Sequence, residues 1–297
     1  EMVDYRRIKF SIPSDLQWTD NLTNDFKIRY KILGASKIWN DSIELWSYIS
    51  ETSEIAVIHQ VTNLKQFNFL SIDELHKKIT ISQGKWKLDK TLVFPSGYSV
   101  HSFPGVELDL INSAKIISYS PLFLIGNQAN PIMIKSSDGS GQGLAVIKAK
   151  QQSEFSNVIF DNLNNPVDNG WSLTGAITFY ESPIKMDRIQ FINNNSEDYL
   201  NVKRSSYLIT NSLFLGTKSD AFDADFSTGT IKNTSFINIG NDAIDFSGSN
   251  VTINNAKFFD IKDKVISIGE NSSVKIKNIE AVVFNDVFEY AQIAVAK

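Results

Sequence analysis

Five aspartates occupy matching positions on two successive segments of the chain. Asp220, Asp223 and Asp225 lie in one short segment, and Asp242 and Asp245 follow 22 residues after the first two. Asp223, Asp225 and Asp245 are expected in the middle of strands, where aspartate is disfavoured, so these three positions favour a functional role. Carboxylates held close together stay ionised only beside a cation, or one of them has a raised pKa. The pattern therefore predicts either a site for a hard cation or a pair of carboxyl groups for acid and base chemistry.

The element that must position these aspartates is a repeat of 22 residues between about residues 205 and 290. Its first block recurs as Ile209, Asn211 and Phe214, then Ile231, Asn233 and Phe236, then Ile253, Asn255 and Phe258. A fixed period of this length with two β-rich runs is typical of a solenoid in which each repeat forms one coil. The runs alternate with a period of 2 rather than with the helical period. We therefore expect an all-β fold, a parallel β-helix with about 22 residues per coil.

Alternation along the strands predicts which side chains face the solvent. With Phe222 and Ala224 directed into the core, Asp223 and Asp225 project outward. One outward column is expected to read Thr178, Asn201, Asp223, Asp245, Ser267 and Glu289, and a second to read Tyr180, Lys203, Asp225 and Ser247. Asn211, Asn233 and Asn255 are expected to form an internal asparagine ladder in a turn.

Asp220 and Asp242 also have a structural interpretation. Both are expected in the turn before a strand, where an aspartate side chain commonly accepts hydrogen bonds from backbone N–H groups. The cations Lys203, Arg204 and Lys218 lie near enough in register to compensate the acidic charge. The two alternatives for these aspartates, structure and chemistry, both remain open at this point.

The chain divides at about residue 70. Residues 1–70 do not share the repeat and are expected to form a small β-rich N-terminal module, with a strand where Phe26, Ile28 and Tyr30 alternate with basic residues. The β-helix is expected over residues 71–297. Ser71 and Glu74 match a capping box, which predicts a short helix over residues 72–78 that plugs the end of the core. The strand pattern continues to the last residue, so we expect further coils or domains beyond it.

Composition narrows the classes of function. The 297 residues are 42% hydrophobic, which supports a substantial core, and include no cysteine, so a thiol nucleophile and a cysteine-based metal site are excluded. The net charge of -4 argues against a nucleic-acid partner. No apolar run is long enough to predict a membrane-spanning helix.

A family resemblance rests on the turn residues between positions 84 and 105. Gly84, Asp89, Pro95, Gly97, Pro104 and Gly105 punctuate this stretch. It resembles the entry coil of right-handed parallel β-helix proteins of the pectate-lyase-like superfamily, which includes polysaccharide lyases, pectin hydrolases, alginate epimerases and phage tailspikes. The resemblance covers roughly residues 71–297. It implies a right-handed coil and a polysaccharide partner, in a fold that hosts several chemistries as well as inert binders.

The resemblance to the lyases also implies a site. Lyases of this fold typically hold Ca²⁺ with carboxylates, and here Asp223, Asp225, Asp245 and Asp220 would be the ligands. The ion neutralises a uronate carboxylate, and a nearby Lys or Arg removes the C5 proton; Lys203 or Arg204 would be that base. The expected function is thus a Ca²⁺-assisted polysaccharide lyase or C5-epimerase acting on uronate polymers.

Two other functions remain open. A glycoside hydrolase would draw its acid and base from Asp223, Asp242 and Asp245. A non-catalytic adhesin or structural spine would need only a stiff solenoid with a polar face. An enzyme requires the acidic ladder at the floor of a groove, for which residues 164–170 with Trp171 and residues 193–197 are candidate walls.

A second resemblance concerns location. The run at residues 263–270 resembles a motif of bacterial surface β-helix proteins, which adds Lys264 and Glu270 to the candidate residues. The expected location is therefore secreted or at the cell surface, in the bacterial envelope.

Overall fold

In the computed structural model, the structure describes residues 27–31, 37–42, 61–168, 171–269, 271–282 and 293–295. The chain divides into two units, Glu1–Glu54 and Ile55–Lys297, and each is described by itself. In the first unit, β1 (Lys27–Lys31) pairs antiparallel with β2 (Ile38–Ser42), so a strand forms where the alternation predicted one.

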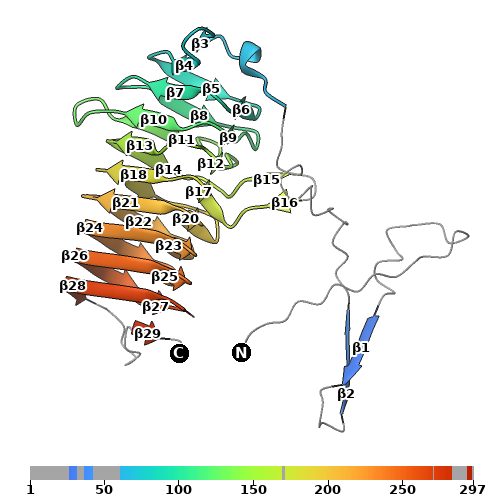
Figure 1. Ribbon diagram of the computed structural model, residues 1–297, viewed down its shortest axis with the longest axis vertical. Coiled ribbons are helices and arrows are strands. Elements are labelled where there is room, and N and C mark those ends of the chain that lie inside the picture. Colours follow the sequence, from blue (N-terminus) through green and yellow to red (C-terminus); the bar gives the residue numbers. More distant parts are fainter. Residues whose placement is uncertain are drawn as a thin grey trace, which may run out of the picture. The chain divides into compact units, whose positions relative to one another are not determined.

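The second unit is a parallel β-solenoid of about nine turns with a repeat of about 23 residues, which confirms the predicted fold class (Figure 1). One row of strands forms a nine-stranded sheet. In chain order its strands are β6 (Leu92–Phe94), β9 (Ile116–Ser118), β12 (Leu144–Ile147), β17 (Gly175–Tyr180), β20 (Asp198–Lys203), β23 (Asp220–Asp225), β25 (Ile244–Ser247), β27 (Ile266–Ile268) and β29 (Ile293–Val295). Every pairing within this sheet is parallel, as expected when successive coils stack.

The other two rows of strands belong to a 16-stranded sheet. The first row contains β4 (Lys78–Ile81), β7 (Ser99–Ser102), β10 (Leu122–Ile125), β13 (Ser153–Ser156), β18 (Ile184–Asp187) and β21 (Ser206–Thr210). The second row contains β5 (Lys85–Leu88), β8 (Glu107–Leu110), β11 (Ile132–Lys135), β14 (Val158–Asp161), β19 (Gln190–Ile192) and β22 (Leu213–Thr217). The rows merge in three long strands, β24 (Thr228–Ile239), β26 (Asn250–Ile261) and β28 (Ser273–Val282). Each coil therefore contributes to three faces around one core.

The core is a stack of like side chains. Phe191, Phe214, Phe236 and Phe258 are buried on successive coils, and their ring centroids lie 4.3, 4.8 and 5.1 Å apart with nearly parallel planes. The phenylalanine of the predicted repeat thus becomes a continuous aromatic column. Burial of each ring removes a large apolar area from water, which is the main stabilising contribution along the solenoid.

The asparagines of the repeat mark the corner between the two rows. Asn211, Asn233 and Asn255 have φ values of 52°, 52° and 57°, a left-handed conformation that asparagine tolerates better than most residues. Nδ2 of Asn233 donates to Oδ1 of Asn211 at 3.0 Å, and Nδ2 of Asn255 donates to Oδ1 of Asn233 at 2.8 Å. The predicted ladder exists, but its side chains are exposed rather than internal, because the left-handed corner directs them outward.

The predicted helix at residues 72–78 is wrong. This segment is an antiparallel hairpin of β3 (Leu70–Asp73) and β4. The side chain of Asp73 accepts the backbone N–H of His76 at 3.0 Å and closes the turn, and Glu74 bonds Tyr98 and Lys77 instead of capping a helix. In the described residues, the helical element is a short 3₁₀ turn, η2 (Leu64–Gln66). Leu64 in this turn is buried in the main core, together with Phe67 and Phe69 shortly after it.

Candidate functional site

The predicted outward columns are present on the nine-stranded sheet. In one column, Thr178, Asn201, Asp223, Asp245 and Ser267 are direct partners on five successive strands. In the other, Tyr180, Lys203, Asp225 and Ser247 are direct partners. Glu289, expected at the end of the first column, lies outside the described residues.

The first column changes character along the solenoid. Its earlier members, Val93, Ile117 and Ala145, are buried although they point away from the main core. Trp171 and Leu173, in and after a small hairpin of β15 (Val167–Asp168) and β16 (Trp171–Ser172), pack against them. This face of the sheet is therefore covered and apolar in the early coils and becomes polar and then acidic from Thr178 onward.

A buried lysine fastens the hairpin to the sheet. Nζ of Lys115 donates to the backbone oxygen of Val167 at 2.8 Å and to the side chain of Gln142 at 3.2 Å, and it lies 3.6 Å from a carboxylate oxygen of Asp168. The excursion at residues 164–170, predicted as a possible cleft wall, is described over residues 164–168, and its hairpin covers an apolar patch with Trp171 and Leu173. After the hairpin, the hydroxyl of Thr174 lies 3.4 Å from the Asn201 amide in the polar part of the column.

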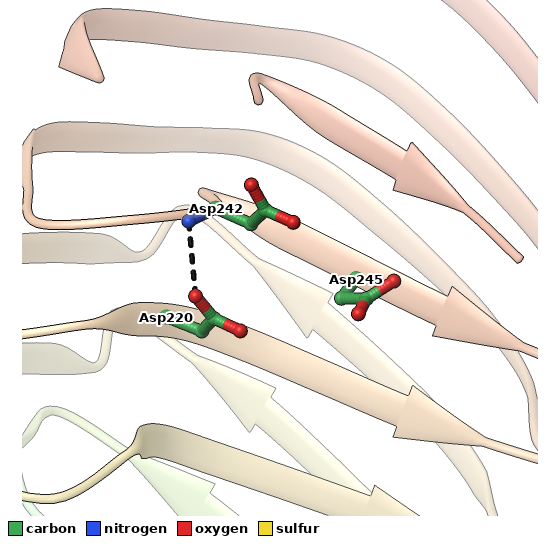
Figure 2. Close-up of side chains that lie close together, drawn as sticks. All are labelled: Asp220, Asp242 and Asp245. Carbon is green, nitrogen blue, oxygen red and sulfur yellow. Dashed lines mark hydrogen bonds between the residues drawn. The ribbon is translucent and has the colours of Figure 1, made fainter. Parts of the chain in front are cut away.

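The acidic triad consists of Asp220, Asp242 and Asp245. One carboxylate oxygen from each lies within 4.8 Å of the others, and Figure 2 shows the three side chains close together, Asp220 at the start of β23, Asp245 on β25 and Asp242 just before β25. Oδ1 of Asp220 accepts the backbone N–H of Asp242 at 2.9 Å and the amide of Asn241 at 2.6 Å. Asp220 therefore accepts the hydrogen bonds predicted for its structural role and is also one of the three converging carboxylates.

Burial raises the pKa of both Asp220 and Asp242, because desolvation penalises their charged forms. Hydrogen bonds oppose this effect at each residue. At Asp242 the opposing groups are the backbone N–H of Lys264 at 2.9 Å and its ammonium, which lies 3.2 Å from each carboxylate oxygen. Lys264, a low-ranking candidate from the sequence, is therefore a direct neighbour of the triad. Glu270 lies outside the described residues.

Asp223 belongs to a separate buried row. Its carboxylate accepts from Nδ2 of Asn201 at 2.7 Å, and the same amide lies 3.2 Å from a carboxylate oxygen of Asp198. Desolvation, with repulsion from Asp198, Asp225 and Asp245, raises the pKa of Asp223 to about 9. Burial raises the pKa of Asp198 to about 6. At neutral pH Asp223 therefore holds its proton beside the acidic triad.

Asp198 is the residue that sequence reasoning missed. It lies 22 residues before Asp220 and pairs with it in the sheet, so the period of the repeat, extended by one coil toward the N-terminus, leads directly to it. The 22-residue repeat is clear in the sequence only from about residue 205, because the spacing of the apolar residues before that point is less regular.

The predicted bases Lys203 and Arg204 are both engaged. Nζ of Lys203 forms an ion pair with a carboxylate oxygen of Asp225 at 2.8 Å, which holds it against its own column of the sheet. Nη1 of Arg204 donates to the hydroxyl of Tyr180 at 2.9 Å. Of the predicted calcium ligands, the structure brings Asp220 and Asp245 together with Asp242, whereas Asp225 faces Lys203 and Asp223 faces Asn201.

The second predicted wall, residues 193–197, is an ordered turn. Nδ2 of Asn194 donates to the hydroxyl of Ser196 at 2.8 Å, and Oδ1 of Asn194 accepts the backbone N–H of Lys218 at 2.9 Å in the next coil. A hollow does occur on the described surface, but it lies at the corner between the two rows of the 16-stranded sheet. Its lining includes Asn157, Ile159 and Arg188 and none of the acidic residues.

Comparisons with known proteins were made with family models, curated proteins and solved structures, and none of them matches this chain. Within the described residues, no helix has the length and apolar character needed to cross a membrane.

Proposed function

We propose that this protein is a carbohydrate-directed β-solenoid that binds a uronate polysaccharide along the outer face of the nine-stranded sheet, with Ca²⁺ at the acidic triad. The observation that carries the proposal is the convergence of Asp220, Asp242 and Asp245 within 4.8 Å. Membership of the pectate-lyase-like superfamily and a secreted or surface location in bacteria are parts of the same proposal.

The triad fits a hard cation by chemistry and by size. All three donors are carboxylates, and Ca²⁺ prefers oxygen ligands at about 2.3–2.6 Å, so two ligands across the ion lie up to about 5 Å apart. The separation of the three oxygens falls within that limit. Burial raises the pKa of Asp220 and that of Asp242, and a cation between the carboxylates would favour their charged forms.

A cation here would supply positive charge for the carboxylates of an anionic sugar polymer. The chain's own residues define where such a polymer lies. The column from Asn201 to Ser267 is polar, and the hairpin over Val93, Ile117 and Ala145 bounds it at one end. The site therefore favours an extended chain of sugars that crosses successive coils, parallel to the axis of the solenoid.

The support is stronger for binding than for elimination chemistry. A lyase or C5-epimerase needs a base that reaches the substrate, and Nζ of Lys203 is engaged by Asp225 at 2.8 Å. One observation favours a second candidate, a glycoside hydrolase. The carboxyl group of Asp223, whose pKa is raised to about 9, stands beside that of Asp245 in the next coil, and a glycoside hydrolase uses two neighbouring carboxyl groups, one of which donates a proton.

The test is calorimetric titration of Ca²⁺ into the wild type and two matched variants. Asp245→Asn removes a triad charge and is expected to lower calcium affinity at least tenfold, whereas Asp225→Asn, in the neighbouring column, is expected to leave it nearly unchanged. Absence of calcium binding in the wild type would refute the cation site. The same samples are then mixed with polygalacturonate and alginate. Ultraviolet absorbance of an unsaturated product would show elimination, new reducing ends without that absorbance would show hydrolysis, and binding alone would show a non-catalytic protein.

A further inference from the structure

Phe226 is an outlier in the backbone and on the surface. Its φ is 49°, in the left-handed region that is strained for a non-glycine residue. For a bulky residue without a polar side chain, this conformation is a genuine outlier. The side chain is also 59% exposed, so burial does not offset the cost.

The position belongs to a corner that several successive coils turn in the same way. Glu181, Arg204, Phe226 and Gly248 follow the nine-stranded sheet on four successive coils and have φ values of 47°, 50°, 49° and 62°. Glycine at this corner is unstrained, and the next coil has it. Phe226 thus shares with Glu181 and Arg204 a conformation that favours glycine, and strain of this kind, enforced by the surrounding structure, clusters at functional sites.

The neighbours of Phe226 leave room for its ring and place a cation beside it. A Cβ atom at Gly248 would lie 2.6 Å from Cδ1 of Phe226, so the ring occupies the space that a side chain at 248 would need. The guanidinium carbon of Arg204 lies 5.9 Å from the ring centroid of Phe226 and 6.0 Å from that of Tyr180. We call these three side chains, Tyr180, Arg204 and Phe226, the aromatic rim.

The rim borders the polar face proposed to bind polysaccharide. Phe226 directly follows Asp225 at the end of β23, and Tyr180 stands in the same outward column as Lys203 and Asp225. The side chain of Arg204 is 54% exposed, and its ion pair with Glu181 is 4.0 Å long. A guanidinium with this exposure is available to a carboxylate from outside, which it can bind in a bidentate manner.

We propose that the aromatic rim is a subsite for one uronate residue, with the C–H face of the sugar on the ring of Phe226 and the sugar carboxylate on Arg204. The inference rests on the proposed polysaccharide function and assigns to the aromatic rim the recognition of one uronate residue of that polymer. Aromatic rings provide large apolar contact area at low cost in side-chain entropy, which suits a sugar face. The charge of Arg204 selects a uronate over a neutral sugar.

Because the backbone of Phe226 is itself strained, the test measures stability and polysaccharide binding separately. Phe226→Gly relieves the left-handed conformation and is expected to keep or raise the melting temperature, while affinity for polygalacturonate or alginate falls about tenfold. Arg204→Gln is expected to weaken binding of these polymers and to leave binding of a neutral polymer such as dextran unaffected. Phe103→Ala is the control, because Phe103 is a 53% exposed aromatic residue on a different turn, after β7.

The outcomes distinguish the two proposals. If the wild type binds uronate polymers in the presence of Ca²⁺ and Phe226→Gly binds them equally well, the rim proposal is overturned and the proposed function stands. If the wild type binds none of these polymers, both fail. A loss of affinity in Phe226→Gly with a lower melting temperature would assign Phe226 to structure and would also overturn the subsite.

Discussion

Asp220 accepts a hydrogen bond at 2.9 Å from the backbone N–H of Asp242, its counterpart one coil later. Asp242 in turn accepts the backbone N–H of Lys264 at the same distance. The same hydrogen bond is thus made twice, and each of the two carboxylates fixes the start of the next coil. This device brings two acidic groups to one place as a consequence of stacking, and Asp245 adds the third. The repeat therefore produces the site.

Lys264 competes with any cation at the triad. Its ammonium lies 3.2 Å from both carboxylate oxygens of Asp242, while its backbone N–H makes the structural bond. Lys264→Met keeps the backbone bond and removes the charge, so we expect calcium affinity to rise about threefold to fivefold. Titration calorimetry measures this, with Lys262→Met as the control, because Lys262 pairs with Asp260. An unchanged affinity would show that the ammonium and the cation do not share the site.

The raised pKa of Asp223 predicts how stability depends on pH. A carboxyl group whose pKa rises from 3.8 in the unfolded chain to about 9 in the fold binds its proton more tightly when folded. Its contribution is therefore most favourable below about pH 4 and is lost as the pH rises toward 9. Asp198, with a pKa of about 6, acts in the same direction over the lower part of this range.

The variant that isolates this effect is Asp223→Asn, which retains an oxygen to accept from Asn201. We expect Asp223→Asn to be more stable than the wild type, by a difference that grows between pH 5 and pH 9. Urea unfolding with a chelator present gives the free energy at each pH. The exposed Asp89→Asn serves as the control for loss of one charge. A difference that stays constant with pH would contradict the raised pKa.

The asparagine ladder gives a prediction about stability that does not depend on the acidic site. Asn233 is bonded to Asn211 on one side and Asn255 on the other, with φ at 52°. Asn233→Ala loses both bonds and strains the corner, so we expect a loss of about 2–3 kcal/mol in the free energy of unfolding. Asn233→Gly loses the bonds without the strain and is expected to cost about 1 kcal/mol less. Equal losses in the two variants would show that the left-handed corner imposes no cost on alanine.

The parts of the site that follow from period and alternation could be predicted from the sequence. The pairing of Asp223 with Asp245 is of this kind, because an offset of 22 residues and a two-residue alternation together define a register. Side-chain direction within the column could not be predicted. Asp223 turns to the Asn201 amide, whereas Asp220, assigned to a turn, lies close to Asp245. These choices depend on burial and on neighbouring donors, which a repeat pattern does not specify.

Local signals failed where tertiary pairing opposed them. The capping-box pattern at Ser71 and Glu74 is compatible with a helix, but Ser71 pairs with Thr80 in a hairpin whose β4 strand stacks on β7. A strand that extends an existing sheet satisfies all of its backbone groups on that side, and this outweighs a weak helix signal. The corner of Phe226 was also beyond prediction, because an exposed phenylalanine carries no signal of its backbone conformation.

Two buried tyrosines on consecutive strands of one coil, β20 and β21, predict opposite responses to the same substitution. The hydroxyl of Tyr199 lies 2.8 Å from the backbone oxygen of Phe160 and accepts the N–H of Ile192 at 3.0 Å. The hydroxyl of Tyr207 is buried and has no hydrogen-bond partner among the described residues. A buried polar group without a partner costs about 1–3 kcal/mol, whereas a satisfied one stabilises by about 1 kcal/mol and leaves its partners unpaired when removed.

We therefore expect Tyr207→Phe to raise the free energy of unfolding by about 1 kcal/mol and Tyr199→Phe to lower it by about 1–3 kcal/mol. The Tyr207 ring is held edge-on against Phe222, with centroids 5.2 Å apart, and lies where a side chain at Gly229 would be, so Tyr207→Phe changes no packing contact. Midpoints of urea unfolding for both variants, measured side by side, decide the matter. A loss of stability in Tyr207→Phe would contradict this expectation. It would mean that the Tyr207 hydroxyl forms a hydrogen bond in solution, for example to a buried water.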